Sequence, residues 1–421
     1  MTVKDRVLQR IDTISIPSFE LLAKMVQEAS TQTKEAGVQE LVAQKLINLG
    51  LIVDIWEPDY AEMQKSPYFI SARENFNDSP NVVGVLKGQG GGRSIILNGH
   101  IDVVPEGDRS KWNAHPYSGK IENGRMYGRG TTDMKGGNIA LLMAIEAIVS
   151  EGVQLKGDVI FQSVIEEESG GAGTLATVLR GYRADAAIIP EPTNLKLFVK
   201  QQGSLWFRIV VKGLAAHGGT RYEGVSAIEK AWLVHKQILQ LEQDRNDRIQ
   251  DPMYEGLPIP IPINVGTIRG GNWPSSVPDE VVLEGRLGVG PEEAVAAAKE
   301  DLEQALQALA AQDSWFALHP PQLEFFGAQW LPNSVATNHP FVEVLEAKYR
   351  EVLNADLRIE ASPWGTDAGI LGTVGGIPAI VIGPGETSVA HYPNEYIELE
   401  AVVQAARLFA LTIMDWCGAT T

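Results

Sequence analysis

Short apolar segments of strand length alternate with helical segments in the first 200 residues, and this alternation limits the fold more than any other feature of the sequence. The strand-like segments occupy residues 51–57, 81–88, 93–104, 158–168 and 185–192. An apolar helical segment bracketed by glycines, residues 136–152, separates the third from the fourth. The pattern predicts an α/β fold with a mixed, mostly parallel sheet flanked by helices. Sheets of this kind bind ligands at the carboxyl ends of their strands.

The pattern changes near residue 200 and changes back near residue 325. Between those points the sequence contains alternating segments typical of half-exposed antiparallel strands, together with amphipathic helical segments. These segments occupy residues 204–217, 226–243, 281–289 and 292–312. They predict a smaller α+β unit that is inserted into the α/β unit.

The chain length supports this division, because 421 residues exceed what one ordinary core accommodates. We expect residues 1–200 and 322–421 to form the α/β domain, and residues 201–321 to form the inserted α+β domain. The larger domain then contains the strand ends at which a ligand site is expected.

Charge and cysteine content exclude several classes of protein. The formal net charge is −18 and the isoelectric point is near 4.9, so nucleic acid and anionic membranes would be repelled. The N-terminal segment has charges every few residues without an apolar export segment, and no apolar run reaches about 18 residues. A single cysteine, Cys417, excludes disulfide scaffolds and thiolate zinc sites. We expect a soluble cytoplasmic protein without nucleic-acid or membrane partners.

The stretch "ILNGHIDVVPEG" ends an apolar segment with His100 and Asp102 two residues apart. Residues i and i+2 of a strand lie on one face, so the carboxylate of Asp102 can hold one ring nitrogen of His100 while the other points outward. An outer carboxylate orients a metal-binding histidine in this way. An ordinary hydrogen-bonded turn is the alternative when this pair is considered alone.

Acidic residues and a second histidine lie at other segment ends. They are Asp133 in a glycine-rich stretch, the run Glu166–Glu168, Glu191 after an apolar segment, and His391 near the C-terminus. Singly, each has an ordinary alternative as a helix cap, a solvated strand end, a turn residue or a surface loop residue. Together, carboxylates at several strand ends would repel one another in one crevice unless a cation lay between them.

The ligand types narrow the choice of cation. Histidine and carboxylate without cysteine match zinc, cobalt or manganese better than a structural zinc finger does. The number of carboxylates predicts two metal ions that share one of them, about 3.5 to 4 Å apart.

Six motifs in fixed order resemble one known family. The stretches "NGHIDVVP", "GRGTTDMKGG", "EEESGG", "EPT", "AHGG" and "AHYPNEY" resemble those of the M20 family of metallopeptidases and deacylases. Within that family the chain is most similar to the branch of acetylornithine deacetylase and succinyl-diaminopimelate desuccinylase. The resemblance covers essentially the whole chain, and it implies a catalytic domain with an inserted domain for dimerisation that also acts as a lid.

The resemblance implies a role for each metal-ligand position. His100 and Glu191 would hold one ion, Glu168 and His391 would hold the other, and Asp133 would bridge them. Two divalent ions are expected, Zn²⁺ first, with Co²⁺ or Mn²⁺ as alternatives.

The resemblance also implies catalytic roles. Asp102 would be the outer partner of His100, and Glu167 would carry the proton from a metal-activated water to the departing amine. Adjacent residues Glu167 and Glu168 can both reach the site only if the backbone turns after the strand. His217 would reach the active site of the other subunit of a homodimer and stabilise the oxyanion there, with a buried turn histidine as the alternative. The peptide bond from Asp133 to Met134 is expected to be cis.

Two arginines compete for a substrate carboxylate. Arg286 lies where relatives place a carboxylate-binding arginine, although its spacing from the preceding Val-Pro is shorter than in the desuccinylase. Arg269 in "GTIRGG" is the competing candidate. A guanidinium fork suits either position, because it matches a carboxylate in a bidentate way.

Two loops resemble the family's substrate contacts. They contribute Gly365 and Thr366 from "PWGTDAG", and the backbone amides of Gly383 and Gly385 from "GPG". Trp364 and Trp273 could add flat apolar walls, with ordinary packing as the alternative.

These observations predict a di-metal amide hydrolase that removes an acyl group from a small N-acyl amino acid or amine, in the manner of acetylornithine deacetylase. The first alternative is a deformylase of an N-formyl aminopyrimidine, followed by a dipeptidase or carboxypeptidase. A non-catalytic metal-binding relative is the alternative from another class, and the intact set of expected ligands speaks against it.

Overall fold

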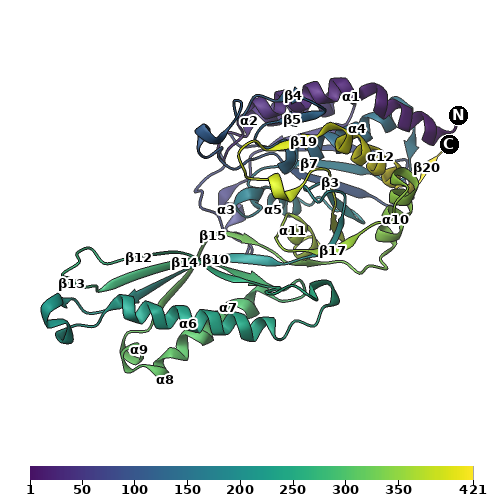
Figure 1. Cartoon of the computed structure of the whole chain (residues 1–421). Coiled ribbons are helices and arrows are strands. Elements are labelled where there is room, and N and C mark those ends of the chain that lie inside the picture. Colours follow the sequence, from purple (N-terminus) through teal and green to yellow (C-terminus); the bar gives the residue numbers. More distant parts are fainter. Residues whose placement is uncertain (421) are drawn as a thin grey trace.

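Nine strands form a large mixed sheet in the computed structural model, which describes residues 1–420 (Figure 1). In spatial order they are β1 (Ile52–Trp56), β2 (Asn81–Leu86), β7 (Val159–Val164), β3 (Ile95–His100), β8 (Ala187–Ile189), β18 (Ala379–Val381), β9 (Leu197–Gln201) and β16 (Asn333–Ser334), with β17 (Ile359–Ser362) also paired to β9. The central strands β7, β3, β8 and β18 are parallel, whereas β2 and β9 run antiparallel to them. The expected α/β class with a mixed sheet is therefore confirmed.

Helices cover both faces of this sheet, because its central strands are apolar on both sides. Asn98 of β3 donates to Thr174 Oγ1 in α5 (Ala172–Leu179) at 2.8 Å. A Cβ added to the next residue, Gly99, would lie 1.8 Å from Asn138 Oδ1 in α4 (Gly136–Ser150). Successive strand residues point to opposite faces, so α4 and α5 cover opposite faces.

The remaining helices of the large sheet pack in these two layers. Against α4 lie α1 (Val3–Gln27) and α12 (Leu399–Trp416), and α10 (Pro340–Leu353) packs on α12. Against α5 lie α3 (Tyr60–Met63) and α11 (Ala368–Thr373). On the α4 side, α2 (Ala36–Asn48) packs on β1 and β2, and its Lys45 pairs with Glu146 of α4. Short pairings complete this part, formed by β4 (Lys120–Glu122), β5 (Arg125–Tyr127) and β19 (Tyr396–Glu398), and by β6 (Gln154–Leu155) and β20 (Ala419–Thr420).

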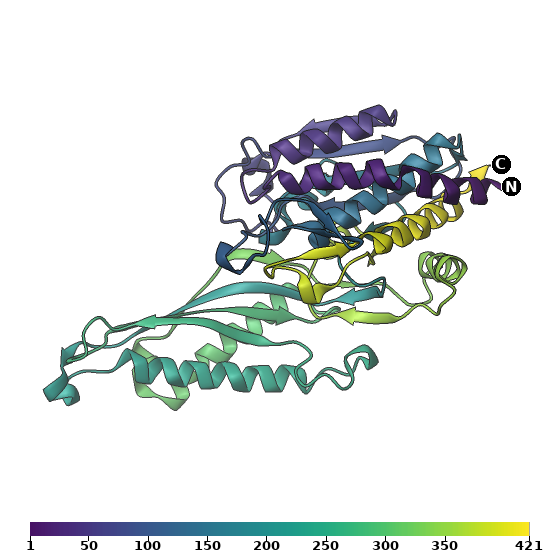
Figure 2. The same cartoon turned by 45° about the horizontal axis from the view of Figure 1, so that its top comes forward.

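A second, antiparallel sheet has its own apolar core. Its strands are β12 (Ile263–Gly270), β14 (Glu280–Val289), β10 (Gly203–Lys212) and β15 (Gln322–Trp330). Figures 1 and 2 show α6 (Ala227–Asn246) and α7 (Val295–Gln307) along the face turned away from the large sheet. Smaller elements here are α8 (Leu309–Gln312), α9 (Ser314–Leu318), β11 (Ala216–His217) and β13 (Ser276–Val277). We call this part the small lobe and the rest the large lobe.

The small lobe extends beyond residue 321, where the sequence pattern predicts its end. Strand β15 continues the small sheet to Trp330. The reason is the alternation in "QLEFF", because Leu323 and Phe325 pack against the core of the small lobe. The lobes are joined where β9 leads through Gln202 into β10, and where β15 leads back to β16.

Within residues 1–420, no helix combines the length and the apolar character that crossing a membrane requires.

Candidate metal centre

The four parallel central strands β7, β3, β8 and β18 have their carboxyl ends on the same side of the large sheet, and the residues expected at the site lie at or after those ends. His100 ends β3, Glu167 and Glu168 follow β7, and Glu191 follows β8. His391 lies in the loop between β18 and β19. This is the edge at which parallel sheets bind ligands.

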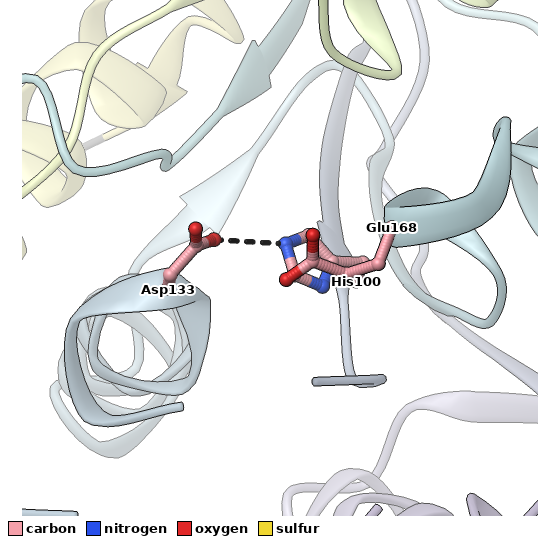
Figure 3. A group of neighbouring side chains, drawn as sticks. All are labelled: His100, Asp133 and Glu168. Atoms are coloured by element: carbon pink, nitrogen blue, oxygen red, sulfur yellow. Dashed lines mark hydrogen bonds and ion pairs between the residues drawn. The ribbon is translucent and has the colours of Figure 1, made fainter. Parts of the chain in front are cut away.

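Asp133 lies between two histidines. Its Oδ1 is 3.2 Å from His100 Nε2, and its Oδ2 is 3.2 Å from His391 Nε2. Glu168 Oε1 is 3.1 Å from the same His391 nitrogen. Figure 3 shows Asp133 facing His100, with Glu168 in front of the ring. A carboxylate whose two oxygens face different ligands is placed to bridge two metal ions.

Two groups of donor atoms are compact enough to hold a cation. His100, Asp133 and Glu168 each offer one atom, and these atoms lie within 4.8 Å of one another. The same holds for His100, Glu167 and Glu191. In the second group, His100 Nε2 is 3.9 Å from Glu167 Oε2 and 3.8 Å from Glu191 Oε1.

The electrostatics of these groups fit a divalent cation. Burial, and then repulsion from Asp133, raises the pKa of Glu191 well above its usual range. Burial also raises the pKa of Glu167, against an opposing effect of His100 and with further repulsion from Glu191. The Asp133 and Glu168 carboxylates raise the pKa of His391 to about 11. A cation between these oxygens would offset the repulsion among the buried carboxylates, so the donor set fits a metal site.

The tautomer of His100 follows from its hydrogen bond. Its Nδ1 lies 2.9 Å from the backbone carbonyl oxygen of Asp102, and the nearest carboxylate oxygen of Asp102 is 3.7 Å away. A carbonyl can only accept, so Nδ1 carries the hydrogen and Nε2 is left for a metal ion. The spacing of His100 and Asp102 in the sequence predicts that the carboxylate holds the ring. In the structure the backbone carbonyl of Asp102 makes the shorter contact.

The carboxylate of Asp102 instead fixes the turn that follows β7. Its two oxygens accept the backbone N–H groups of Glu167 at 3.2 Å and of Glu168 at 3.1 Å. The preceding residue, Glu166, has φ 64°, and a 3₁₀ turn covers Glu167–Ser169. The expected turn is therefore present, and it explains how neighbouring glutamates both reach the site.

Glu166 points away from the metal centre. Its Oε1 accepts from Arg73 Nη1 at 2.9 Å, and the same nitrogen is 3.5 Å from Glu35 Oε1. Sequence reasoning missed Arg73 and Glu35, because nothing in their local sequence marks a site.

A cleft of about 500 Å³ opens onto the metal-ligand residues. Its apolar walls include three tryptophans, Trp206, Trp330 and Trp364, and Gly365 and Thr366 also line it. The indole N–H of Trp330 donates to Glu167, 3.2 Å from Oε1 and 3.1 Å from the backbone oxygen. Sequence reasoning named Trp364 but missed Trp206 and Trp330, because tryptophans in the strands of a second sheet read as packing residues.

Only one of the two candidate arginines lines the cleft. Arg286 lines the cleft, and its Nη2 donates to Gln202 Oε1 at 3.2 Å. Among residues 1–420, no carboxylate lies within ion-pair distance of Arg286, and burial lowers its pKa. Arg269 is 74% exposed on β12, 3.7 Å from Glu284 Oε2, and does not line the cleft. Within one chain, the fold therefore does not bring Arg269 to the cleft.

Other expected substrate contacts lie outside the cleft lining. The amide of Gly383 is not free, because it donates to Thr193 Oγ1 at 3.1 Å. Gly385 has φ 88°, and a Cβ there would lie 2.3 Å from Thr132 Oγ1, so this glycine permits close backbone packing. Trp273 is 68% exposed on the small lobe. Close packing of the "GPG" loop accounts for the positions of Gly383 and Gly385.

His217 lies on the small lobe, outside the large lobe that carries the expected metal ligands. It is exposed at the end of β11, and its Nδ1 accepts the backbone N–H of Gly219 at 3.0 Å. It does not line the cleft, so within one chain the fold does not bring it to the site.

Comparisons with known proteins agree on one family. The sequence model described as peptidase family M20/M25/M40 matches residues 96–415. The N-formyl-4-amino-5-aminomethyl-2-methylpyrimidine deformylase of Halalkalibacterium halodurans is 31% identical over 402 residues, covering 91% of this chain and 89% of that protein. The acetylornithine deacetylase of Edwardsiella ictaluri is 29% identical, covering 96% of this chain and 98% of that protein. A dinuclear metal-binding peptidase of Bacillus subtilis shares the fold, with a TM-score of 0.66 at 18% identity over 96% of this chain and 99% of that one.

Proposed function

The chain belongs to peptidase family M20/M25/M40, whose members hydrolyse amide bonds, and on that premise we propose that it removes an acyl group from a small N-acyl amine. The observation that carries this proposal is the position of Asp133, with each carboxylate oxygen facing a different histidine. We assign His100 and Glu191 to one divalent ion and Glu168 and His391 to the other, with Zn²⁺ first among the candidates. Bound there, the ions would polarise the amide carbonyl and acidify a water molecule.

Glu167 is the residue that we assign to proton transfer. Its Oε1 is held by the Trp330 indole N–H at 3.2 Å, which leaves Oε2 on the side of His100. This oxygen would accept a proton from the attacking water and deliver it to the amine nitrogen as the C–N bond breaks. Glu167 is 6% exposed, so bulk water competes little for that proton.

The tryptophan walls support a planar amine as the substrate. Three indole rings line the cleft beside the metal-ligand residues, and flat faces of this kind stack on flat rings. A relative that is 31% identical is named as a deformylase of an aminopyrimidine. We therefore place an N-formyl aminopyrimidine ahead of acetylornithine, which reverses the order expected from sequence.

Arg286 supports acetylornithine as the second candidate. Its guanidinium lines the cleft without a carboxylate partner among the described residues, which suits the carboxylate of an acyl amino acid.

A substrate comparison on the metal-loaded protein tests the proposal. We expect kcat/KM for the N-formyl aminopyrimidine to exceed that for acetylornithine at least tenfold. Arg286→Met should lower kcat/KM for acetylornithine by about 10- to 100-fold, because a hydrogen bond to a charged group contributes about 1.5–3 kcal/mol. The same change should alter the pyrimidine reaction less than threefold, and the exposed Arg269→Met is the matched control. No hydrolysis of any N-acyl amine by protein that carries both ions would contradict the proposal.

We also propose that His217 acts in the neighbouring subunit of a homodimer, because it is exposed on the small lobe and absent from its own cleft. Mixing His217→Ala chains with Glu167→Gln chains should then restore activity, since a hybrid dimer contains one complete site. Random exchange of equal amounts would restore about one quarter of the sites. As a control, each variant is cross-linked before mixing, which prevents subunit exchange and should prevent recovery of activity. If subunit exchange is verified and activity still does not recover, His217 does not act in the neighbouring subunit.

A further inference from the structure

One buried ion pair near the metal centre has no part in the chemistry proposed above. Arg129 follows β5 and Glu395 precedes β19, and these two strands pair with each other. The side chains are 2% and 0% exposed, and Arg129 Nη1 lies 2.5 Å from Glu395 Oε2. Burying two charges carries a large desolvation cost, so the remaining hydrogen bonds of such a pair decide what it stabilises.

The second oxygen of Glu395 holds the backbone on which the bridging carboxylate stands. Glu395 Oε1 accepts the backbone N–H of Thr132 at 3.0 Å and of Asp133 at 3.3 Å. The position of Asp133 is therefore tied to Glu395 through the main chain.

The second guanidinium nitrogen of Arg129 holds two other loops. Arg129 Nη2 donates to the backbone oxygen of His391 at 3.1 Å and to that of Pro105 at 3.4 Å. One ion pair thus connects the loop of Asp133, the loop of His391 and the loop after His100.

His100 itself is held by other contacts. It ends β3 inside the sheet, its backbone oxygen accepts from Asn138 Nδ2 at 2.7 Å, and its ring is fixed by the carbonyl of Asp102. Of the distances in the metal centre, the one between Asp133 Oδ2 and His391 Nε2 therefore depends most on the ion pair.

We propose that Glu395 and Arg129 are positioning residues that set this spacing and thereby the affinity of the metal ion held by His391 and Glu168. This inference rests on the proposed function, since it assumes the two ions. The binding affinities of the two ions should depend on this pair to different extents, because His391 lies on a loop and His100 lies in a strand. Loss of a partner behind the ligands typically weakens metal binding about 10- to 100-fold.

Metal titration of the metal-free full-length protein tests the inference without turnover. Mn²⁺ binding is followed by calorimetry, and electron paramagnetic resonance reports the magnetic coupling between two bound ions. For Glu395→Gln we expect one of the two Kd values to rise about 10- to 100-fold, the other to change less than threefold, and the signal from magnetically coupled ions to fall at equal total metal. Equal weakening of both ions, or no change in either, would overturn the inference.

Two further variants separate positioning from general stability. Arg129→Lys keeps the positive charge and one hydrogen-bond donor, so its affected Kd should lie between those of the wild type and Glu395→Gln. This variant also tests the inference if Glu395→Gln does not fold. Glu293→Gln is the matched control, because Glu293 pairs with the buried Arg245 at 2.7 Å in the small lobe, away from the metal centre. It should lower the melting temperature without changing either Kd. A wild type that binds no ion would instead overturn the proposed function, and this inference with it.

Discussion

Glu167→Gln is expected to lower kcat by about 10²- to 10⁴-fold while both metal ions stay bound, because general acid–base catalysis contributes a factor of this order. The amide keeps the shape of the side chain, and its oxygen can still accept from the Trp330 indole, 3.2 Å away in the wild type. It cannot accept a proton from water and return it to an amine. Single-turnover kinetics and metal analysis of the gel-filtered protein measure the two quantities separately.

The same variant decides between two roles for Glu167. Its Oε2 belongs to one of the two compact donor groups, with His100 and Glu191, so it could be a ligand instead of a base. A ligand role predicts loss of an ion, whereas the assigned role predicts loss of turnover alone. Glu166→Gln is the matched control, since Glu166 is the adjacent buried glutamate but pairs with Arg73 at 2.9 Å. That control should lose stability and keep most of its turnover.

Asp133→Ala is expected to reduce the metal content from two ions per chain to at most one, and to abolish most of the activity that depends on both ions. Each oxygen of Asp133 faces a different histidine at 3.2 Å, so its removal takes a donor from both ions at once. With one metal ion fewer, the repulsion between the buried carboxylates of Glu191 and Glu167 is offset less. Elemental analysis after gel filtration gives the metal content.

Asp367→Asn is the control for that experiment. Asp367 is also a buried carboxylate, 1% exposed, and burial raises its pKa to about 6. It accepts from Thr174 Oγ1 at 2.8 Å and belongs to neither compact donor group, so this variant should retain both ions. Two ions retained by Asp133→Ala would contradict the bridging assignment.

Much of the site could be predicted because its residues follow strand ends. His100, Glu167, Glu168 and Glu191 each come directly after an apolar segment, and parallel strands bring such positions to one edge. What the local pattern cannot show is which atom makes a contact. The sequence placed the carboxylate of Asp102 on His100, whereas in the structure the carbonyl of Asp102 makes that contact and the carboxylate fixes the next loop.

The residues that were missed come from positions without local periodicity. Glu395 and Arg129 are 266 residues apart, and Trp330 reaches Glu167 over 163 residues. Their meeting depends on how loops close and on how the small lobe meets the large one. The choice of Arg286 over Arg269 is of the same kind. Both lie in paired strands of one sheet, but Arg286 is opposite Asn264 and Arg269 is opposite Val282, and only Arg286 lines the cleft.

The sequence by itself determined the α/β class and the ligand types at the strand ends, because the periodicity of apolar residues and the placement of ionisable ones are local properties. The family resemblance added the roles expected of those residues. Only the tertiary structure decided which oxygen faces which nitrogen, which tryptophans line the cleft, and where the ion pair behind the ligands lies. Those outcomes depend on packing between segments far apart in the chain, which no single stretch of sequence encodes.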